Sequence, residues 1–439
     1  MIFKNKKKNI FVFLIICILI ILLGYSQTLT VLPGQITLLE GDNFAYDFKS
    51  PFFVSVTPDK EGVISLISDK IKGKSINLAF SNPCSLKSLK QGCVNLKMSL
   101  FGIIPVKTME INVVANREVV ACGNTVGVKI RTKGLLVIGI SDVEDADGNK
   151  NYPAKQCGIK PGDLILKANG NDLASINDFI EQINNSNGHS ISVSIKHGQE
   201  IVNKEIKPVM SSDDSKYHLG LWVRDSTAGI GTLTFYDPNT NCFGALGHGI
   251  TDLDTGELMT VKEGQILEST ILSIKRGKQG APGELKGIFM EDRKSLGVIS
   301  KNSEFGIYGV LENNGASRLS GKTYPVALKT QVKEGPAKIL SNIDGNSVEE
   351  YSVEIQKVSR QKLDSAKGMV IKVTDKKLLA LSGGIVQGMS GSPIIQDGRI
   401  VGAVTHVLVN DPTRGYGIFI EKMMQNMVGG KQQVLEKAG

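Results

Sequence analysis

The sequence predicts a mostly β protein built from several domains. The chain has 439 residues, and single hydrophobic cores stop growing well below that length, so two to four domains are expected. Glycine is abundant, with 48 residues, while aromatic residues make up only 6% of the chain. Short runs rich in valine and isoleucine alternate with polar, glycine-containing turns, and few stretches have helical periodicity. This combination is typical of short strands joined by tight turns.

The first 26 residues are predicted to bring the chain to a membrane. Lysines at positions 4, 6, 7 and 8 precede an uncharged apolar run over residues 10–25. This run is long for the core of a signal peptide and slightly short for a bilayer span, so cleavage after Ser26 and retention as an anchor both stay open. We favour the retained anchor. Lysines before the run place the N-terminus in the cytoplasm and the rest of the chain outside it.

Charge and cysteine spacing argue against two classes of site. The net charge is +8 with a pI near 9.0, and beyond the N-terminal lysines the positive charge is spread without an arginine-rich stripe. A nucleic-acid partner is therefore not expected. None of the six cysteines shows the CxxC spacing of a zinc site. We expect neither a metal nor an organic cofactor.

Residues 27–126 read as a β-rich, membrane-proximal module. Short apolar runs such as QITLL, FFVSV and VNLKMSL alternate with polar turns. No group of side chains in this region suggests catalysis. Its role stays open at this level.

Residues 127–210 carry a different pattern. A glycine is followed by an apolar strand over 134–141, and the run GIKPGDLILKANG follows it. An amphipathic helix is expected around SINDFIEQINN and a hairpin after it. The segment resembles the PDZ domains of bacterial extracytoplasmic proteases. The resemblance implies a groove in which a peptide adds as a strand beside a glycine-leucine loop, lined here by Gly134, Leu135, Leu136 and Val137.

Ser390 lies in the glycine-rich stretch GMSGSP, which returns at once to strand-like sequence. Glycines adopt backbone conformations that other residues avoid, so neighbouring N–H groups can point to one spot beside the serine hydroxyl. The amides of Gly388 and Ser390 are the expected donors. Such a pair binds the oxygen of a tetrahedral acyl intermediate. The stretch is therefore interpreted as a nucleophile with an oxyanion hole rather than a plain surface turn.

His248 is the expected base for this serine. A serine hydroxyl is a weak nucleophile and needs a base, and imidazole has a suitable pKa near neutrality. His248 lies between two glycines, just past the second strand of an expected hairpin. His406, in GAVTHVLV, is expected to be a structural or pocket-lining residue. The strand over 401–406 follows a predicted turn at Asp397–Gly398 and should run beside the nucleophile.

A histidine on an early hairpin and a serine in GxSGxP on a late loop resemble the chymotrypsin-like double β-barrel. The stretches GTLTFYDP, GHGI and GGIVQGMSGSPIIQDGRIVGAVTH, behind a PDZ-like segment, resemble the SpoIVB peptidase family of endospore formers. The resemblance covers nearly all of the chain after the anchor and is strongest over residues 219–421. The predicted domains are an anchor (1–26), a β-rich module (27–126), a PDZ domain (127–210) and a serine peptidase domain (211–439).

The resemblance implies a serine endopeptidase of sporulation signalling, exported from the forespore into the space between its two membranes. Such an enzyme cuts itself and then a membrane-bound regulator, which releases an intramembrane protease and activates a late sigma factor. The PDZ domain would restrain or target the peptidase through the chain's own cleaved end or the partner's tail.

The sequence offers more than one carboxylate as the third member of a catalytic triad. A carboxylate must orient His248 and stabilise its protonated form. By resemblance the family's acid falls on Asp375, just before the serine loop. Asp252 and Asp254, which follow the histidine directly, are alternatives. Asp375 precedes KKLLAL, so it also has the position of a helix N-cap.

Two other functions remain open. One is a non-catalytic scaffold whose PDZ domain delivers a signal beside a degenerate barrel. The other is a quality-control protease of the HtrA kind, which would degrade many unfolded proteins rather than a few specific sites. Self-cleavage of a Ser390→Ala variant and digestion of casein would separate the three.

Overall fold

The computed structural model describes residues 34–46, 54–67, 76–78, 84–198, 200–289, 294–345, 347–359 and 366–427. Strands dominate these residues, which confirms the mostly β prediction. The predicted anchor lies outside the described residues. Within the ranges above, no helix has both the length and the apolar character needed to cross a membrane.

The chain forms two compact units, and the first ends at Arg117. Its five-stranded sheet has the order β1 (Gln35–Leu39), β8 (Ile104–Val114), β7 (Gly92–Leu100), β3 (Val54–Pro58), β5 (Ile76–Leu78). Its three-stranded sheet has the order β2 (Asn43–Tyr46), β6 (Cys84–Ser88), β4 (Ile64–Ile67). Alternate residues of β7, from Val94 to Leu100, are buried, as expected for a strand with one face on a core.

The second unit, Glu118–Gly430, contains two β-barrels. In the first barrel the order is β10 (Thr125–Ile140), β21 (Glu263–Lys275), β23 (Gly297–Ser303), β24 (Gly306–Leu311), β20 (Cys242–Ala245), β19 (Leu221–Tyr236). Pairing of β10 with β19 closes this ring. The neighbouring strands are β9 (Glu118–Ala121), β25 (Lys322–Pro325) and β22 (Glu284–Phe289).

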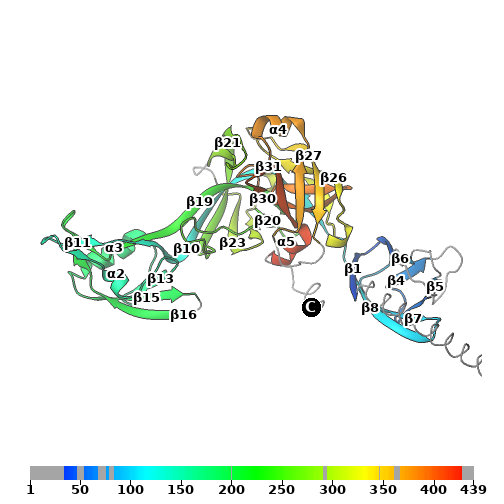
Figure 1. Cartoon of the computed structure of the whole chain (residues 1–439), viewed down its shortest axis with the longest axis horizontal. Coiled ribbons are helices and arrows are strands. Elements are labelled where there is room, and N and C mark those ends of the chain that lie inside the picture. The colour runs from blue at the N-terminus through cyan, green and yellow to red at the C-terminus, as the bar shows by residue number, and fades with distance from the viewer. Residues whose placement is uncertain are drawn as a thin grey trace, which may run out of the picture. The chain divides into compact units, whose positions relative to one another are not determined.

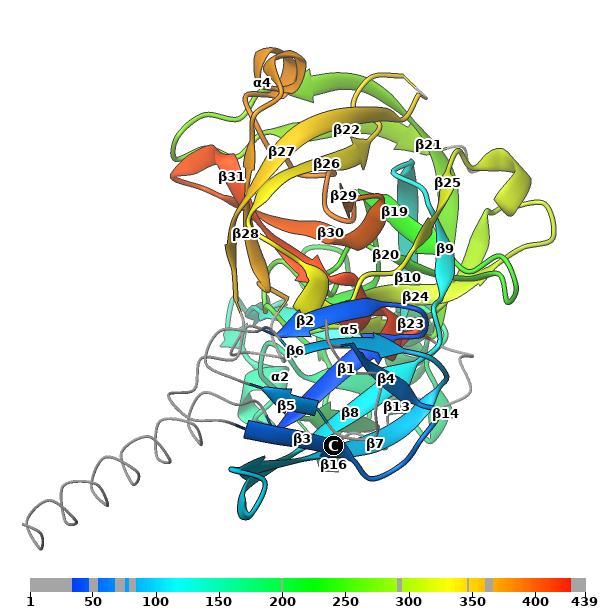
Figure 2. The same ribbon diagram turned by 90° about the vertical axis from the view of Figure 1, so that its right-hand side faces the viewer.

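The second barrel is closed by β26 (Gly335–Ser341), β27 (Glu349–Val358), β28 (Met369–Val373), β31 (Asp411–Phe419), β30 (Arg399–Leu408) and β29 (Pro393–Gln396). Helix α4 (Lys376–Ser382) precedes the serine loop, and α5 (Ile420–Asn426) follows the last strand. Asp397 and Gly398 have φ values of 49° and 74°, which confirms the tight turn between β29 and β30. The two barrels match the expected double-barrel architecture (Figure 2).

The PDZ elements are carried on two strands that also belong to the first barrel. Residues 125–131 of β10 pair with 226–232 of β19 in the barrel, while 136–140 pair with 221–224 in the PDZ region. The two long strands extend together from the barrel to the PDZ elements (Figure 1). These elements are α2 (Pro153–Gln156), β13 (Leu164–Ala168), β14 (Asn171–Asp172), α3 (Ile176–Asn185), β15 (Ile191–His197) and β16 (Glu200–Ile206).

Helix α3 forms as its sequence predicts. Ser175 caps its first turn by accepting a hydrogen bond from the Asp178 amide at 3.2 Å. Phe179 and Ile183, one helical turn apart, are buried against the PDZ core. The helix thereby covers one side of the sheet beside β19.

This arrangement bears on the predicted domain boundaries. The boundary at residue 127 falls inside β10, and β9 pairs with strands β19 and β25 of the peptidase region. Residues 118–131 therefore complete the first barrel rather than the module predicted over residues 27–126, and the PDZ elements are an insertion between two barrel strands.

Candidate active site

Ser390 lies on the loop that joins α4 to β29. The loop is anchored in its middle by Met389, which is fully buried in the core of the second barrel. Gly391 has a φ of 99°, and a Cβ there would lie 2.0 Å from the Thr232 carbonyl oxygen. Only glycine fits this position, because it combines a disfavoured φ with direct main-chain packing. Ser390 itself is half-buried and faces a cavity.

His248 follows β20 on a loop of the first barrel. Its Nδ1 lies 2.8 Å from the carbonyl oxygen of Gly249. A carbonyl only accepts hydrogen bonds, so Nδ1 carries the proton and Nε2 keeps its lone pair. Burial lowers the pKa of His248 below its usual value, against a smaller opposite effect of the Gly249 carbonyl. The imidazole is therefore neutral at neutral pH, as a general base must be.

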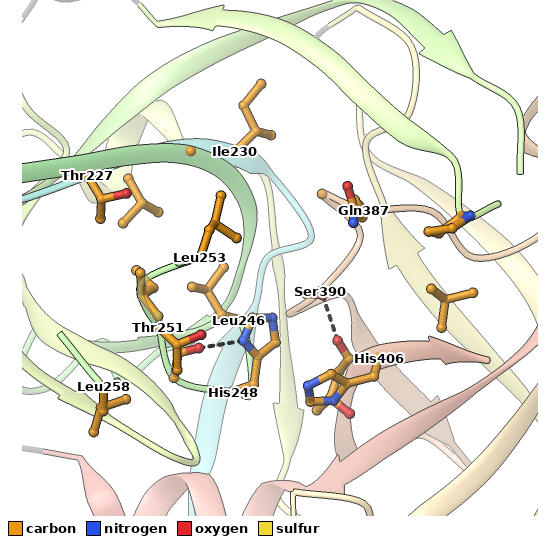
Figure 3. A pocket seen from close by; sticks show the side chains of 18 of the residues that line it. Thr227, Ile230, Leu246, His248, Thr251, Leu253, Leu258, Gln387, Ser390 and His406 are labelled. Carbon is orange, nitrogen blue, oxygen red and sulfur yellow. Dashed lines mark hydrogen bonds between the residues drawn. The ribbon is translucent and has the colours of Figure 1, made fainter. Parts of the chain in front are cut away.

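Both side chains line one cavity of about 970 Å³ (Figure 3). The fold thus brings together the serine and histidine that the sequence singles out, although 141 positions separate them along the chain. The Ser390 hydroxyl donates to the Thr405 carbonyl at 2.6 Å. For Ser390 to attack, its hydroxyl must turn from this carbonyl toward the imidazole.

The main-chain amides of the serine loop divide into used and free donors. Four of them donate to main-chain carbonyls: Gln387 to Gly283 (2.8 Å), Met389 to Val386 (3.1 Å), Gly391 to Val404 (2.7 Å) and Ser392 to Met389 (3.0 Å). Within the described residues, the amides of Gly388 and Ser390 donate to no acceptor. Both residues line the cavity. The two donors that the sequence suggests for an oxyanion are thus the two that the loop leaves free.

Asp375 is not part of this cavity in the structure. It is the N-cap of α4, where its Oδ1 accepts from the Leu378 amide at 3.0 Å. Its Oδ2 accepts from the Ser352 amide at 3.3 Å. Both carboxylate oxygens are therefore occupied by main-chain donors away from His248.

The two alternative acids are also engaged elsewhere. Asp252 is buried, forms an ion pair with Arg224 and accepts from the amides of Asp254 and Thr255, both at 3.0 Å. Asp254 pairs with the same Arg224 at 2.9 Å. Among the described residues, the only hydrogen-bond partner of the His248 ring is the Gly249 carbonyl. This carbonyl performs the orienting role that the sequence assigns to a carboxylate.

His406 lies beside His248, with the ring centroids 4.9 Å apart and the rings tilted by 39°. It lines the same cavity as Ser390 and His248, in keeping with the expected pocket-lining place (Figure 3). Desolvation, together with the neighbouring charges of His248 and Lys367, lowers the pKa of His406 to about 4. A neutral His406 adds no positive charge next to the base.

The residues expected to line the PDZ groove lie inside the sheet. Leu135 and Leu136 pair with Ile165 and Leu164 of β13 on one side. On the other side, Leu136 and Val137 pair with β19. The stretch Gly134–Val137 therefore offers no open edge to an incoming strand in this structure.

An open edge lies one strand further on. Residues 221–224 of β19 pair with β10 alone in the part of the chain that the structure describes. Their other side faces α3, whose first amide, on Ile176, donates to the Asp225 carboxylate at 3.4 Å. Trp222 is 63% exposed on this strand and Ile180 is 47% exposed on the helix. A strand edge beside a helix with exposed apolar side chains is the geometry that takes up an extended peptide.

Two family models match the chain. The SpoIVB peptidase S55 model matches residues 215–424, and the PDZ domain model matches residues 144–196. A protein of Clostridium perfringens (strain 13 / Type A), whose name assigns it provisionally to the zinc metalloproteases, is 28% identical over 83 residues. That match covers 19% of this chain and 24% of the relative, so the chain spans about a quarter of the relative's length.

Solved structures show more distant likenesses. The PDZ domain of the SdrC-like protein from Listeria monocytogenes is 25% identical and covers 21% of this chain and 87% of its own, with a TM-score of 0.17. The Rv3671c protease in its inactive form is 13% identical, with coverages of 44% and 81% and a TM-score of 0.23. The HtrA-type protease AlgW with a decapeptide is 9% identical, with coverages of 49% and 54% and a TM-score of 0.27. At these TM-scores the likenesses carry no argument about function.

The assignment therefore depends on the family models and on the site they contain. The matched region includes both His248 and Ser390, and the structure brings these two side chains to one cavity beside two free amides. By these matches the chain carries a SpoIVB peptidase S55 domain over residues 215–424, behind a PDZ domain over residues 144–196.

Proposed function

We propose that the chain is an extracytoplasmic serine endopeptidase of sporulation signalling, with Ser390 as nucleophile and His248 as base. The observation that supports this most directly is the shared cavity, where a hydroxyl, a neutral imidazole and two unpaired amides meet. Each of these groups supplies one requirement of peptide-bond hydrolysis through an acyl-enzyme.

The proposed reaction follows from the positions of these groups. The Ser390 oxygen adds to the carbonyl carbon of the scissile bond, and its proton passes to Nε2 of His248. The carbonyl oxygen becomes an oxyanion, which the amides of Gly388 and Ser390 bind. The imidazolium then gives its proton to the leaving amine, and the C–N bond breaks. Water, activated by the same imidazole, hydrolyses the acyl-enzyme and restores Ser390.

We further propose that the enzyme cuts its own chain and the extracytoplasmic part of a membrane-bound regulator of sporulation. The family match supports this role, and the basic, apolar N-terminal sequence supports a place at the membrane outside the cytoplasm. The cut would release an intramembrane protease and so activate a late sigma factor. The compartment implied is the space between the two forespore membranes.

The PDZ domain is proposed to bind a peptide end, either the chain's own or that of the regulator. The open edge of residues 221–224 is the place that we propose for the added strand, in preference to Gly134–Val137. Main-chain hydrogen bonds along the edge would supply affinity, and the exposed side chains of Trp222 and Ile180 would contact alternate side chains of the peptide.

The test of the catalytic proposal is labelling of the purified chain with a serine-directed fluorophosphonate. We expect the wild-type chain to be labelled and Ser390→Ala to lose both the label and self-cleavage. His248→Ala should label roughly 100- to 10,000-fold more slowly, since it lacks the base. Labelling that does not depend on Ser390 would contradict the proposal and favour a non-catalytic PDZ scaffold.

The range of substrates separates signalling from quality control. A signalling peptidase should cut its own chain at few sites and leave casein largely intact. Extensive degradation of casein would favour an enzyme of the HtrA kind instead.

A further inference from the structure

Thr232 connects the two halves of the proposed active site. It lies on β19 and is fully buried. Its amide donates to the carbonyl of Ser390 at 2.9 Å, and its own carbonyl accepts from the amide of Leu246 at 3.1 Å, two residues before His248. Its hydroxyl donates to the carbonyl of Gly388 at 2.7 Å. One residue therefore contacts both the histidine segment and the serine loop.

The two bonds to the serine loop act on the residues that carry the free amides. Gly388 has no side chain to restrict its rotation, so its carbonyl could turn into the cavity if nothing held it. A carbonyl oxygen there would repel an oxyanion instead of binding it. The hydroxyl of Thr232 holds this carbonyl away from the cavity, and the Thr232 amide holds Ser390 in the same way.

We propose that Thr232 is a positioning residue, whose hydroxyl keeps the Gly388–Ser390 segment in the conformation that binds the oxyanion. This role rests on the proposed function of Ser390 as nucleophile. Thr232 touches no substrate and acts only through the loop.

The same strand offers a matched control. Thr234 lies two residues further along β19 and is equally buried. Its hydroxyl has no hydrogen-bond partner among the described residues. Thr232→Val and Thr234→Val thus make the same chemical change at the same burial, and only the first removes a hydrogen bond to the loop.

The experiment measures fluorophosphonate labelling of the full-length chain and separates its maximal rate from its half-saturating concentration. We expect Thr232→Val to lower the maximal rate by at least tenfold, approaching the roughly hundredfold loss seen when an oxyanion donor is removed. The half-saturating concentration should change less than about twofold, because ground-state binding does not use the oxyanion site. Thr234→Val should label at the wild-type rate.

A second pair of variants covers the case in which Thr232→Val does not fold. Thr232→Ser and Thr232→Ala both lose the γ-methyl group, and only the serine variant keeps the hydroxyl. We expect the serine variant to label within about threefold of wild type and the alanine variant at least tenfold more slowly, at similar melting temperatures.

The outcomes keep the two proposals apart. Labelling of Ser390→Ala would overturn the proposed function. Loss of labelling in Ser390→Ala with wild-type rates in Thr232→Val and Thr232→Ala would overturn the positioning role alone. An equal loss in Thr234→Val would also overturn it, since the effect would then come from packing rather than from the hydrogen bond.

Discussion

At the scale of single residues, His248 has a defined tautomer without a carboxylate partner. Its Nδ1 donates to the neighbouring Gly249 carbonyl, while the three candidate acids are bound to main-chain amides or to Arg224. A carbonyl orients the ring, but it stabilises the imidazolium less than a full negative charge does. The ring of His406 lies beside it, with the two ring centroids 4.9 Å apart.

The pH dependence of activity should report the environment of His248. Because burial lowers its pKa, the neutral, active form persists below pH 6.5, and activity should fall only when the pH drops through the lowered pKa. We expect His406→Glu to raise that pKa, since a carboxylate beside the ring favours the imidazolium. In a plot of labelling rate against pH, the fall on the acid side (the acid limb) should move up by about one pH unit.

His406→Gln is the control for this substitution, because it adds no charge, and its acid limb should stay within a few tenths of a unit of wild type. An unchanged limb in His406→Glu would show that His406 does not share the electrostatic environment of the base.

Asp375 can be tested by separating its capping role from its charge. Asparagine is as good an N-cap as aspartate, whereas alanine loses the bond to the Leu378 amide. We expect Asp375→Ala to lower the free energy of unfolding by about 1 kcal/mol and Asp375→Asn to lower it by much less. Denaturant unfolding measures both.

The labelling rate of Asp375→Asn decides whether the carboxylate also serves catalysis. From its position in the structure we expect a rate within a few-fold of wild type. A large loss at unchanged stability would show that Asp375 reaches His248 in another conformation, as the family resemblance implies.

At the scale of elements, the serine loop is shaped by contacts on both of its sides. Met389 anchors it in the core of the second barrel, and β19 of the first barrel holds its main chain. Within this packing the amides on either side of Gly388 and Ser390 donate to main-chain carbonyls, while those of Gly388 and Ser390 donate to no acceptor among the described residues. The conformation of the loop therefore depends on the junction between the two barrels as well as on the loop's own glycines.

Gly391→Ala tests this packing, with Gly398→Ala as its control. Both glycines have positive φ, so each alanine should cost about 1–2 kcal/mol of backbone strain. A Cβ at Gly398 meets open space, whereas one at Gly391 meets the Thr232 carbonyl at 2.0 Å. We expect Gly398→Ala to keep the labelling rate and Gly391→Ala to lose it almost entirely.

Thermal melting and labelling of both variants provide the measurement. Equal effects in the two variants would mean that strain alone, and not contact with β19, accounts for the glycine in the loop.

At the scale of the whole molecule, the first barrel begins before the PDZ elements in the chain, although the histidine and serine motifs come after them. Strands β9 and β10 precede the PDZ elements but pair with barrel strands that follow them. The PDZ region is thus inserted into the first barrel, and its open strand edge is the start of β19, the same strand that carries Thr232.

Fragments of the chain should reflect this insertion. A fragment of residues 118–427 keeps both barrels closed, and we expect it to fold and to take up the fluorophosphonate label. A fragment of residues 211–427 lacks β9 and β10 and leaves the edges of β19 and β21 unpaired. We expect it to aggregate or remain unfolded by circular dichroism. A folded, labelled 211–427 fragment would contradict the insertion.

The sequence by itself determined features whose physical cause is local. Apolar runs between polar turns predict strands, Asp375 stands where a helix cap stands, and Asp397–Gly398 marks a turn. The glycines around Ser390 and His248 likewise single out a hydroxyl and an imidazole, and the fold brings both to one cavity.

Only the tertiary structure decided which distant groups become partners. Thr232 and Thr234 are alike in sequence, strand and burial, yet only one bonds a loop 156 residues away. Likewise, Gly134–Val137 has the composition of a groove but lies between two strands, and Asp375 contacts amides rather than the imidazole. A local pattern reports which side chains are buried, whereas hydrogen-bond partners and open edges depend on how the two barrels and the insertion close against one another.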